Sequence, residues 1–396
     1  MAWRNLGRSR RRTAVLLAAA AVGVAGSFLT TSMGRGIGNA MVETAVSTEL
    51  GHVQVHPAGY ELDPGLHRRF FEEVEPISQL LAQGTQVRAW APRLRADGLI
   101  SSSHSSSAFS LMGVDPDAEA GVSTLAESVV TGGFLDGSQG SIVLGEELAE
   151  RLAVSVGQKV VVSLQDGANE MANEAVRVRG ILRTPFPEFD ANTALMTLDD
   201  ARRLLGVGAS VSEFVVLSED REDLDALIEQ LRSGLSGNVE IRSWRELRPV
   251  LVFAVEYLML NAAAMYLTVF IATAFGIAGV LYMAVHERIP EFGVLASIGM
   301  RPGRIVLLVM IEALLLVALG TLLGVILGVA GVRLMQGGVP LGAMGALGAE
   351  VRVVPAFLPR QLLVPAVLAA VAAVGGSLAP AIRAARLAPV AATRHT

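Results

Sequence analysis

HERIPEFGVLASIGMRPGR, at positions 286–304, separates two long apolar runs. Its apolar and small residues recur at three- and four-residue spacing, which predicts an amphipathic helix: Phe292, Leu295, Ile298 and Gly299. Pro290 suits the first turn of such a helix. A charged, amphipathic helix held between two membrane spans is suited to be gripped by a separate protein. The stretch therefore predicts a membrane chain that a partner sets in motion.

Four apolar runs are long enough, or nearly so, to cross about 30 Å of hydrocarbon as helices. We expect transmembrane spans at 13–33, 261–285, 305–332 and 361–379. A hydrophobic content of 52% and a mean hydropathy of +0.50 agree with a membrane protein. Glu312 is the one formal charge within these runs. Because a membrane carboxylate is costly, we expect it either to pair with Arg288 or Arg304 or to extend to the membrane interface.

Arginine placement predicts the orientation of the chain. Segments 1–12, 286–304 and 380–396 together hold 11 basic and two acidic residues, so we expect them to be cytoplasmic. Residues 34–258 and 333–360 then lie on the outer side. Both termini are expected to be cytoplasmic.

The first apolar run has an alternative interpretation as a cleaved signal peptide, because its start is arginine-rich and its centre alanine-rich. However, Met33, Ile37 and Met41 continue at four-residue spacing. This spacing favours a helix that projects beyond the membrane.

The region from 34 to 258 is an acidic globule attached to a basic membrane part. It holds 18 basic and 33 acidic residues, a net charge of −15, whereas the rest of the chain carries +10. The acidic balance argues against nucleic acid as a partner.

This region has the pattern of an α+β domain. We expect strands at 52–56, 87–100, 109–114, 142–144, 159–164, 175–182, 193–196, 213–217 and 239–242, and helices at 66–81 and 223–231. The outer pieces predict split ferredoxin-like βαβ units, with an inserted β-rich subdomain, a small barrel or sandwich, at about 113–205. We expect SSSHSSS (101–107) to be a flexible loop. Residues 184–190 are expected to project, with Phe186 and Phe189 exposed.

No catalytic site is predicted. The chain has no cysteine and no GxxxxGK[ST] motif, so thiol chemistry is excluded and a nucleotide-binding loop is not expected. His52 and His56 share one face of an expected strand without a third ligand, so we expect no metal. We expect no cofactor bound by this chain.

Glycines recur every four residues in the third span, at Gly320, Gly324 and Gly328. Small residues on one helix face let two helices approach closely in a membrane. We expect a packing face, either within the helix bundle or between two chains.

The order of these motifs resembles the permease subunits of the MacB/LolC/LolE/FtsX superfamily of ABC transporters, the mechanotransmission type (type VII). The resemblance is carried by AWRNLGRSRRRT (2–13), SWRELRPVL (243–251), ERIPEFGVLASIGMRPGRI (287–305) and PAIRAARLAPVAATR (380–394). GHVQVHPAGY (51–60), LMGVDP (111–116) and VLGEELAERLAVSVGQKVVV (143–162) are similar to its periplasmic core domain. The chain looks most like a lipoprotein-releasing permease of the LolC/LolE type.

The resemblance implies a multi-pass protein of the bacterial inner membrane. It implies a second permease, identical or paralogous, and a dimer of a cytosolic ABC ATPase that binds ATP and Mg. This chain would be a non-catalytic subunit. By position, the ATPase contact falls on Glu287, Arg288, Glu291, Phe292, Leu295, Ile298 and Gly299.

Three functions compete within this superfamily. In lipoprotein release, the ends of the first two spans form a substrate cavity or, alternatively, a dimer interface, at Ser32, Met33, Ile37, Phe253, Tyr257, Leu260 and Ala264. In MacB-like tripartite efflux, an adaptor protein is the partner, and the ATPase is expected ahead of the first span on the same chain. In the FtsX-like type, the permease is a regulatory scaffold for cell-wall hydrolases. A hairpin at 165–174 is the candidate dock for a periplasmic lipoprotein chaperone, although it lacks the proline expected there.

Overall fold

A computed structural model describes residues 10–59, 70–71, 73–167, 170–221, 223–235, 239–341, 351–357 and 363–385. The chain divides into two compact units. The membrane unit consists of Met1–Asn39, Phe253–Pro340 and Arg352–Thr396. The external domain consists of Ala40–Val252 and Leu341–Val351. Most of the expected cytoplasmic ends (1–9 and 386–396) and parts of the expected loop at 333–360 lie outside the described residues.

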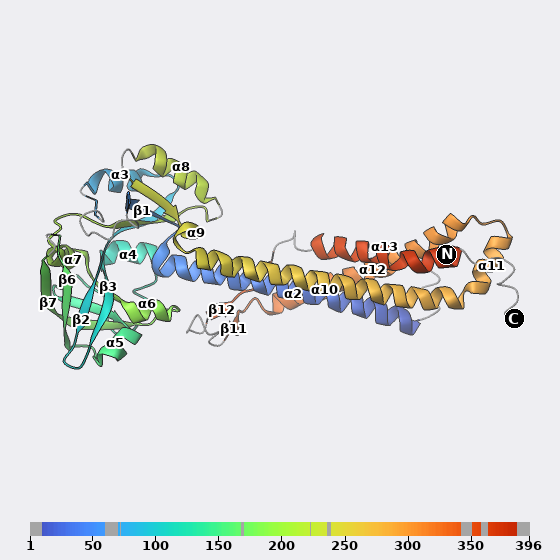
Figure 1. Ribbon diagram of the computed structural model, residues 1–396, viewed down its shortest axis with the longest axis horizontal. Helices are drawn as coiled ribbons and strands as arrows, with labels where there is room; N and C mark the ends of the chain where they lie inside the picture. Colours follow the sequence, from blue (N-terminus) through green and yellow to red (C-terminus); the bar gives the residue numbers. More distant parts are fainter. Residues whose placement is uncertain are drawn as a thin grey trace. The chain divides into compact units, whose positions relative to one another are not determined.

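Four helices of the described chain are long and apolar enough to cross a membrane. They are α2 (Arg10–Ala45), α10 (Pro249–Glu287), α12 (Pro302–Leu334) and α13 (Leu363–Ala385). A short helix, α11 (Ile289–Ser297), lies between α10 and α12 in the sequence. Two short strands, β11 (Val339–Leu341) and β12 (Val351–Val353), pair after α12. Within the membrane unit, Figure 1 shows α2 (blue) and α10 (gold) running side by side.

Helix α2 is longer than its apolar run. It continues past Met33 to Ala45, as the spacing of Met33, Ile37 and Met41 predicted, and a π-helical turn follows at Val46–Leu50 (η1). Gly51 ends this turn with a φ of +63°. A Cβ at Gly51 would also come within 2.4 Å of the Val215 side chain, so this position requires glycine.

The external domain contains the predicted ferredoxin-like half. Its elements are β1 (Val53–Pro57), α3 (Glu75–Gln83), β2 (Val87–Ser101), β9 (Glu213–Ser218), α8 (Leu224–Gly234) and β10 (Val239–Ser243). The strand order is β10-β1-β9-β2, and all neighbours are antiparallel. Helices α3 and α8 bury Leu81, Leu227 and Leu231 in the same core as strands β1 and β9.

The second half of the domain is a closed β-barrel. Its further strands are β3 (Ser106–Val114), β5 (Ser141–Gly145), β6 (Lys159–Gln165), β7 (Met171–Leu182) and β8 (Thr193–Thr197). The ring closes in the order β2-β3-β8-β5-β7-β6 and back to β2. Among the described strands, β4 (Val129–Gly132) pairs with β7 alone. Short helices lie at α4 (Pro116–Val122), α5 (Glu146–Leu152), α6 (Pro187–Asn192), α7 (Leu198–Leu205) and α9 (Trp244–Leu247).

The predicted boundary of the β-rich insertion, 113–205, is wrong at its start. The barrel takes in the second part of β2 and all of β3, which the sequence pattern assigned to the outer piece. Strand β2 has 15 residues. Its first part, from Val87 to Arg93, pairs with β9, and its last part, from Gly98 to Ser101, pairs with β6. One strand therefore belongs to both halves of the domain.

Three local predictions also need correction. The helix expected at 66–81 begins only at Glu75, and residues 66–69 and 72 lie outside the described chain. Phe71 instead forms an isolated bridge to Val211 and packs on Phe214, with ring centroids 5.5 Å apart. Pro76 near the start of α3 fits this late beginning.

The serine-rich stretch is a hairpin turn and not a flexible loop. Strand β2 ends at Ser101 and β3 begins at Ser106. The hydroxyl of Ser102 donates to the Leu152 carbonyl at 2.7 Å, which fixes the turn on α5.

The segment at 184–190 is also not a projecting loop. Phe189 is buried in helix α6, and Phe186 packs partly buried against two small cores.

Candidate functional site

Helix α11 is joined to α10 by a single turn residue, Arg288. The backbone N–H of Phe292 donates to the Arg288 carbonyl at 3.0 Å, which starts the short helix. At its end, Gly299 adopts a φ of +93°, and the N–H of Met300 donates to the Leu295 carbonyl at 3.0 Å. This is the glycine-terminated helix end that few other residues tolerate. Gly299 therefore shapes the connection to α12.

The inner face of α11 is fixed to the membrane unit. Phe292 is only 5% exposed and shares a core cluster with Ile277 and Leu281 of α10 and Val309 of α12. Leu295 packs, partly buried, against the same cluster. Both residues were predicted to touch an ATPase. Their placement makes them anchors of α11 in this chain, and their contact with an ATPase stays a prediction.

An ion pair fixes the turn before α11. Arg288 Nη1 lies 3.1 Å from Glu312 Oε2 and 3.3 Å from Oε1, and both side chains are mostly buried. The predicted pairing of Glu312 with an arginine is therefore confirmed, with Arg288 as the partner. Opposite charges in close contact reduce the cost of holding a carboxylate in a membrane span.

The outer face of α11 carries some of the remaining predicted contact residues, whereas Arg288 lies mostly buried in its pair with Glu312. Ile298 is 79% exposed, and Val294, which the sequence reasoning did not select, is 56% exposed. Glu287 and Glu291 are also exposed. Glu291, Val294 and Ile298 follow at three- and four-residue spacing along α11 and the turn that ends it, so these side chains lie on one face, whereas Glu287 ends α10 before the Arg288 turn. This outer face is the surface that a partner could reach.

The glycines of α12 pack against α2 within the chain. A Cβ at Gly320 would lie 2.7 Å from the Cβ of Ala20, and one at Gly324 would lie 2.7 Å from the Ala21 carbonyl oxygen. A Cβ at Gly328 would lie 2.8 Å from the Phe28 ring. The predicted packing face is therefore present, and it serves the intramolecular bundle.

The residues predicted to form a substrate cavity do not form one surface within this chain. Ser32 is fully buried, and its carbonyl accepts from the N–H of Ala356 at 3.0 Å. Met33 and Ile37 are half-buried. In contrast, the α10 members face outward: Phe253, Tyr257, Leu260 and Ala264.

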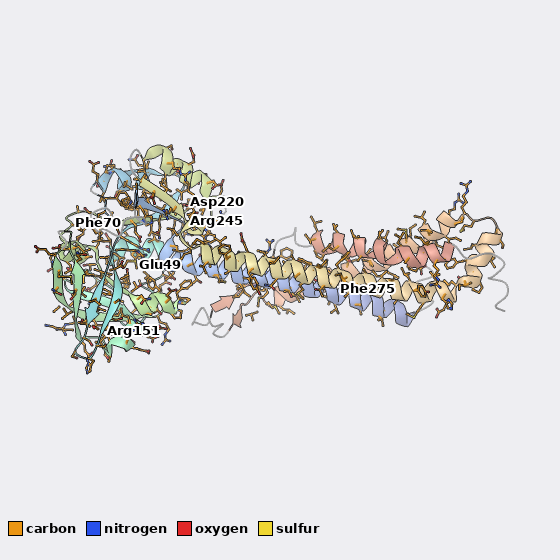
Figure 2. All side chains as sticks on the ribbon, in the orientation of Figure 1. Glu49, Phe70, Arg151, Asp220, Arg245 and Phe275 are labelled. Carbon is orange, nitrogen blue, oxygen red and sulfur yellow. The ribbon has the colours of Figure 1, made fainter. Side chains whose placement is uncertain are left out.

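These α10 residues begin a longer apolar seam, which we call the α10 seam. It consists of exposed residues at three- and four-residue spacing: Phe253, Tyr257, Leu260, Ala264, Leu267, Ile271 and Phe275. Phe275, labelled in Figure 2, is 75% exposed. Such spacing is that of helices that pair along a seam.

Comparison with protein families decides the identity of the chain. A model described as the MacB-like periplasmic core domain matches residues 13–233, which is more than half of the chain. A model described as the FtsX-like permease C-terminal matches residues 263–389. The chain belongs to the MacB-like family of ABC transporter permeases. With its four apolar helices, the permease is an inner-membrane protein with a periplasmic domain.

Curated relatives are similar over part of the permease. The lipoprotein-releasing system transmembrane protein LolC of Neisseria meningitidis is 28% identical over 252 residues, which are 61% of this chain and 60% of the relative. LolC of Xylella fastidiosa is 24% identical over 252 residues, 62% of this chain and 60% of the relative. An uncharacterized ABC transporter permease of Methanocaldococcus jannaschii is 28% identical over 160 residues, 39% of this chain and 42% of the relative. The match thus spans about three fifths of the LolC relatives.

Two solved structures are similar at low identity. The periplasmic region of MacB from Actinobacillus actinomycetemcomitans matches with a TM-score of 0.38 and 11% identity, covering 53% of this chain and 97% of that one. The extracellular domain of the noncanonic ABC-type transporter YknZ from Gram-positive bacteria matches with a TM-score of 0.35 and 13% identity, covering 49% and 100%.

The permease also contains a charge cluster that sequence reasoning missed. In the external domain, Glu49 lies in η1, directly after α2, and is labelled in Figure 2. Its carboxylate accepts from Arg248 at 2.7 Å and from Arg95 at 3.2 Å. Arg248 directly precedes α10. The cluster therefore joins the end of one long helix to the start of another within this domain.

A buried ion pair, Arg93 with Glu119, adjoins this cluster. Arg93 is fully buried and donates to Glu119 through Nε at 3.0 Å and through Nη2 at 2.6 Å. Its third donor, Nη1, bonds to the Glu49 carbonyl. Arg95 Nε donates to Glu213 Oε1 at 2.9 Å. Burial alone would raise the pKa of Glu213, but Arg95, His56 and Arg93 together outweigh burial and hold this pKa below its usual value.

The two histidines of the first strand region act as hydrogen-bonding groups of the sheet. The backbone N–H of Ser218 donates to His52 Nδ1 at 2.9 Å. His56 Nε2 lies 2.9 Å from Gln54 Oε1. Burial, followed by Arg221 and Arg88, lowers the pKa of His52 to about 4, so the ring is neutral at pH 7.

The candidate chaperone dock at 165–174 is the connection between β6 and β7. The last pair of the hairpin is Gln165 with Met171, and residues 168–169 lie outside the described chain. Its role in binding a chaperone stays a prediction.

Proposed function

We propose that this permease passes ATP-driven motion from a dimer of a separate cytosolic ABC ATPase to its periplasmic domain. In this proposal, ATP and Mg bind to the ATPase subunits, and this chain is not itself an enzyme. The proposed result is the extraction of lipoproteins or other lipidic substrates from the inner membrane towards the outer membrane. The observation that carries the proposal is the division of α11 into an anchored inner face and an exposed outer face.

The anchoring suits α11 to transmit force. A partner that pushes on Ile298 and Val294 acts on a helix whose opposite side holds Phe292 in the bundle core. The Arg288–Glu312 pair ties the turn before α11 to α12. Because packed cores resist continuous deformation, a push on α11 is passed to α10 and α12 and is not absorbed by a loose loop.

The substrate class is supported by the two LolC relatives, whose names describe a lipoprotein-releasing system. A second permease, identical or paralogous, is supported by the α10 seam, which runs through seven apolar or small residues that are exposed in the single chain. A MacB-like tripartite efflux permease with an adaptor protein is the second candidate, and it is supported by the match to the MacB-like periplasmic core domain.

The first test is purification of the tagged full-length permease in mild detergent, with identification of bound proteins by mass spectrometry. An ABC ATPase together with acylated lipoproteins is the expected result. Recovery of an adaptor and an outer-membrane duct would favour efflux over lipoprotein release as the function. Recovery of a cell-wall hydrolase would favour an FtsX-like regulatory role over lipoprotein release. The absence of any ATPase from an intact permease dimer would contradict the proposal.

Variants of α11 test the docking surface. We expect Ile298→Asp combined with Val294→Arg to abolish co-purification of the ATPase, since both changes fall on the exposed face. The matched control is Leu334→Asp, which places an aspartate on an 87%-exposed residue at the end of α12 that is distant from α11. Equal ATPase recovery from both variants would show that α11 does not bind the ATPase.

The absence of cysteine from the sequence allows a direct test of orientation. A single cysteine at Ile298 should react with a membrane-impermeant maleimide only after the cells are opened. A single cysteine at Ser103, in the exposed turn of the periplasmic domain, should react once the outer membrane alone is permeable. The reverse pattern would invert the proposed cytoplasmic placement of α11 and of both termini.

A further inference from the structure

The membrane unit contains a cavity of about 270 Å³ among helices α2, α10 and α12. The cavity exists because several residues at this point of the helices have small side chains. Helices α2 and α10 touch where a Cβ at Gly23 would come within 2.9 Å of Val269. One to two turns further along α10, Ala272, Thr273 and Gly276 leave space that larger side chains would fill. The cavity is distinct from the predicted substrate residues, which lie further toward the external domain along α2 and α10.

The cavity has a closed floor and an open rim. Ile277, Leu281 and Val317 form part of the floor and are almost fully buried. On the rim, Val22 is 68% exposed, and Gly276 is also exposed. These residues belong to segments that are apolar and long enough to cross a membrane. The rim therefore opens towards lipid hydrocarbon.

The chemistry of the lining selects an apolar occupant. Thr273 carries the one side-chain hydroxyl among the described lining residues, and the others offer hydrocarbon or backbone. A stably bound water needs two to four polar partners, so water does not fit the lining. On the scale of an apolar cavity of about 150 Å³ that binds benzene, this volume holds roughly ten carbon atoms. If the cavity stayed empty, the side chains that line it would have no partner atoms for dispersion contacts on that side.

We propose that this cavity binds part of an acyl chain of a bilayer phospholipid, which enters sideways from the membrane. The lipid acts as a wedge whose inner end contacts Ile277 and Leu281. These two residues share a core cluster with Phe292, the inner anchor of α11. An acyl chain in the cavity therefore supports the core that holds α11. This inference requires only the membrane insertion of the chain and does not depend on docking of an ATPase.

Photocrosslinking in nanodiscs tests the proposal on the full-length permease. The nanodiscs contain phosphatidylethanolamine and phosphatidylglycerol, with a trace of a phospholipid that carries a diazirine on one acyl chain. After irradiation, peptide mass spectrometry should find adducts concentrated on residues 269–281 and 19–23. Adducts no more frequent there than on the exposed α13 residues Val367 and Val371 would overturn the proposal.

Two glycines of α10 provide a matched pair of variants. A Cβ at either Gly276 or Gly279 meets nothing within 4 Å, and both glycines are exposed, but only Gly276 lines the cavity. Four added carbons take up a large part of a space for roughly ten, so Gly276→Leu should reduce the cavity adducts by about half or more. Gly279→Leu should leave them unchanged. Equal adduct yields from the two variants would contradict the site.

A second pair protects the test against misfolding. Ala272→Leu fills the cavity from its rim, whereas Ala263→Leu adds the same side chain to an exposed position of α10 outside the cavity. Two further outcomes would also overturn the proposal. Labelling that occurs only with a diazirine-bearing triacylated lipopeptide would assign the site to the substrate. A disulfide between two copies of a Gly276→Cys variant, without lipid adducts, would assign the space to a second permease.

Discussion

Glu49 and Arg248 form a 2.7 Å ion pair between the turn that follows α2 and the residue that precedes α10. The two residues are 199 positions apart in the sequence. Within the external domain, the pair ties together the two chain segments that continue as long helices. Arg248 is half exposed, so the pair is worth only about 0–1 kcal/mol of overall stability. Its effect should therefore be local.

Removing this pair should loosen both helix ends without unfolding the domain. We expect Arg248→Met to raise amide hydrogen exchange at residues 46–50 and 249–252, measured by mass spectrometry. The control is Arg245→Met, because Arg245 stacks on Trp244, 5.4 Å from the ring centroid, and does not contact Glu49 through any described bond. Similar amide hydrogen exchange in the two variants would show that the Glu49–Arg248 pair does not hold the two helix ends.

The buried Arg93–Glu119 pair should be far more costly to break. Arg93→Met leaves Glu119 buried without its partner, and loss of one partner of such a pair typically costs about 3–5 kcal/mol. The double variant Arg93→Met with Glu119→Leu should recover part of this loss. Denaturant titration followed by tryptophan fluorescence measures the effect, since Trp90 and Trp244 both lie in this domain. Arg221→Met, at a pair with Glu43 in which both side chains are about half exposed, should cost at most about 1 kcal/mol.

The stability of the external domain should depend on His52 in acid. The folded pKa of about 4 lies below the unfolded value of 6.5. The stabilisation is thus complete above pH 6.5 and is lost as the pH falls from 6.5 towards 4. The expected slope is about 1.4 kcal/mol per pH unit in this window. His52→Asn keeps an acceptor for the Ser218 N–H and should remove this part of the pH dependence. Parallel curves of stability against pH for the two proteins between pH 7 and 4 would show that His52 does not cause this pH dependence.

The contact between α2 and α12 should not tolerate a larger residue at Gly324. A Cβ there would meet the Ala21 carbonyl oxygen and the Val24 Cβ at 2.7 Å each. Overpacking of this kind typically costs about 1–3 kcal/mol. We expect Gly324→Leu to lower the midpoint of thermal unfolding in detergent. Gly375→Leu, at a position of α13 with nothing within 4 Å, should leave the midpoint unchanged. A normal midpoint for Gly324→Leu would mean that the two helices separate readily.

The sequence was most informative where periodicity and packing agree. The four apolar helices, the ferredoxin-like βαβ pieces and the glycine face of α12 all follow from local patterns. The pairing of Glu312 with an arginine follows from the cost of a lone charge in a membrane, whereas the choice of Arg288 over Arg304 came from the structure. The boundaries of strands such as β9 and β10 were close because turn residues flank them.

Other features depend on contacts between distant residues. A pattern along β2 shows a strand, but nothing local shows that its two ends pair with different partners. Phe292 has the spacing of an amphipathic helix, yet spacing alone does not tell which face meets the bundle. The cluster of Glu49, Arg93 and Arg248 joins residues from three separate parts of the sequence, so no local motif marks it.

The strand shared by the two halves of the external domain has a consequence for how this domain can evolve. Because β2 runs without interruption from the ferredoxin-like sheet into the barrel, no linker separates the halves. The barrel cannot be removed or exchanged as a module without also cutting a strand of the other half. We therefore expect insertions in this domain to be tolerated in the turns and short helices between strands, and not within the shared strand.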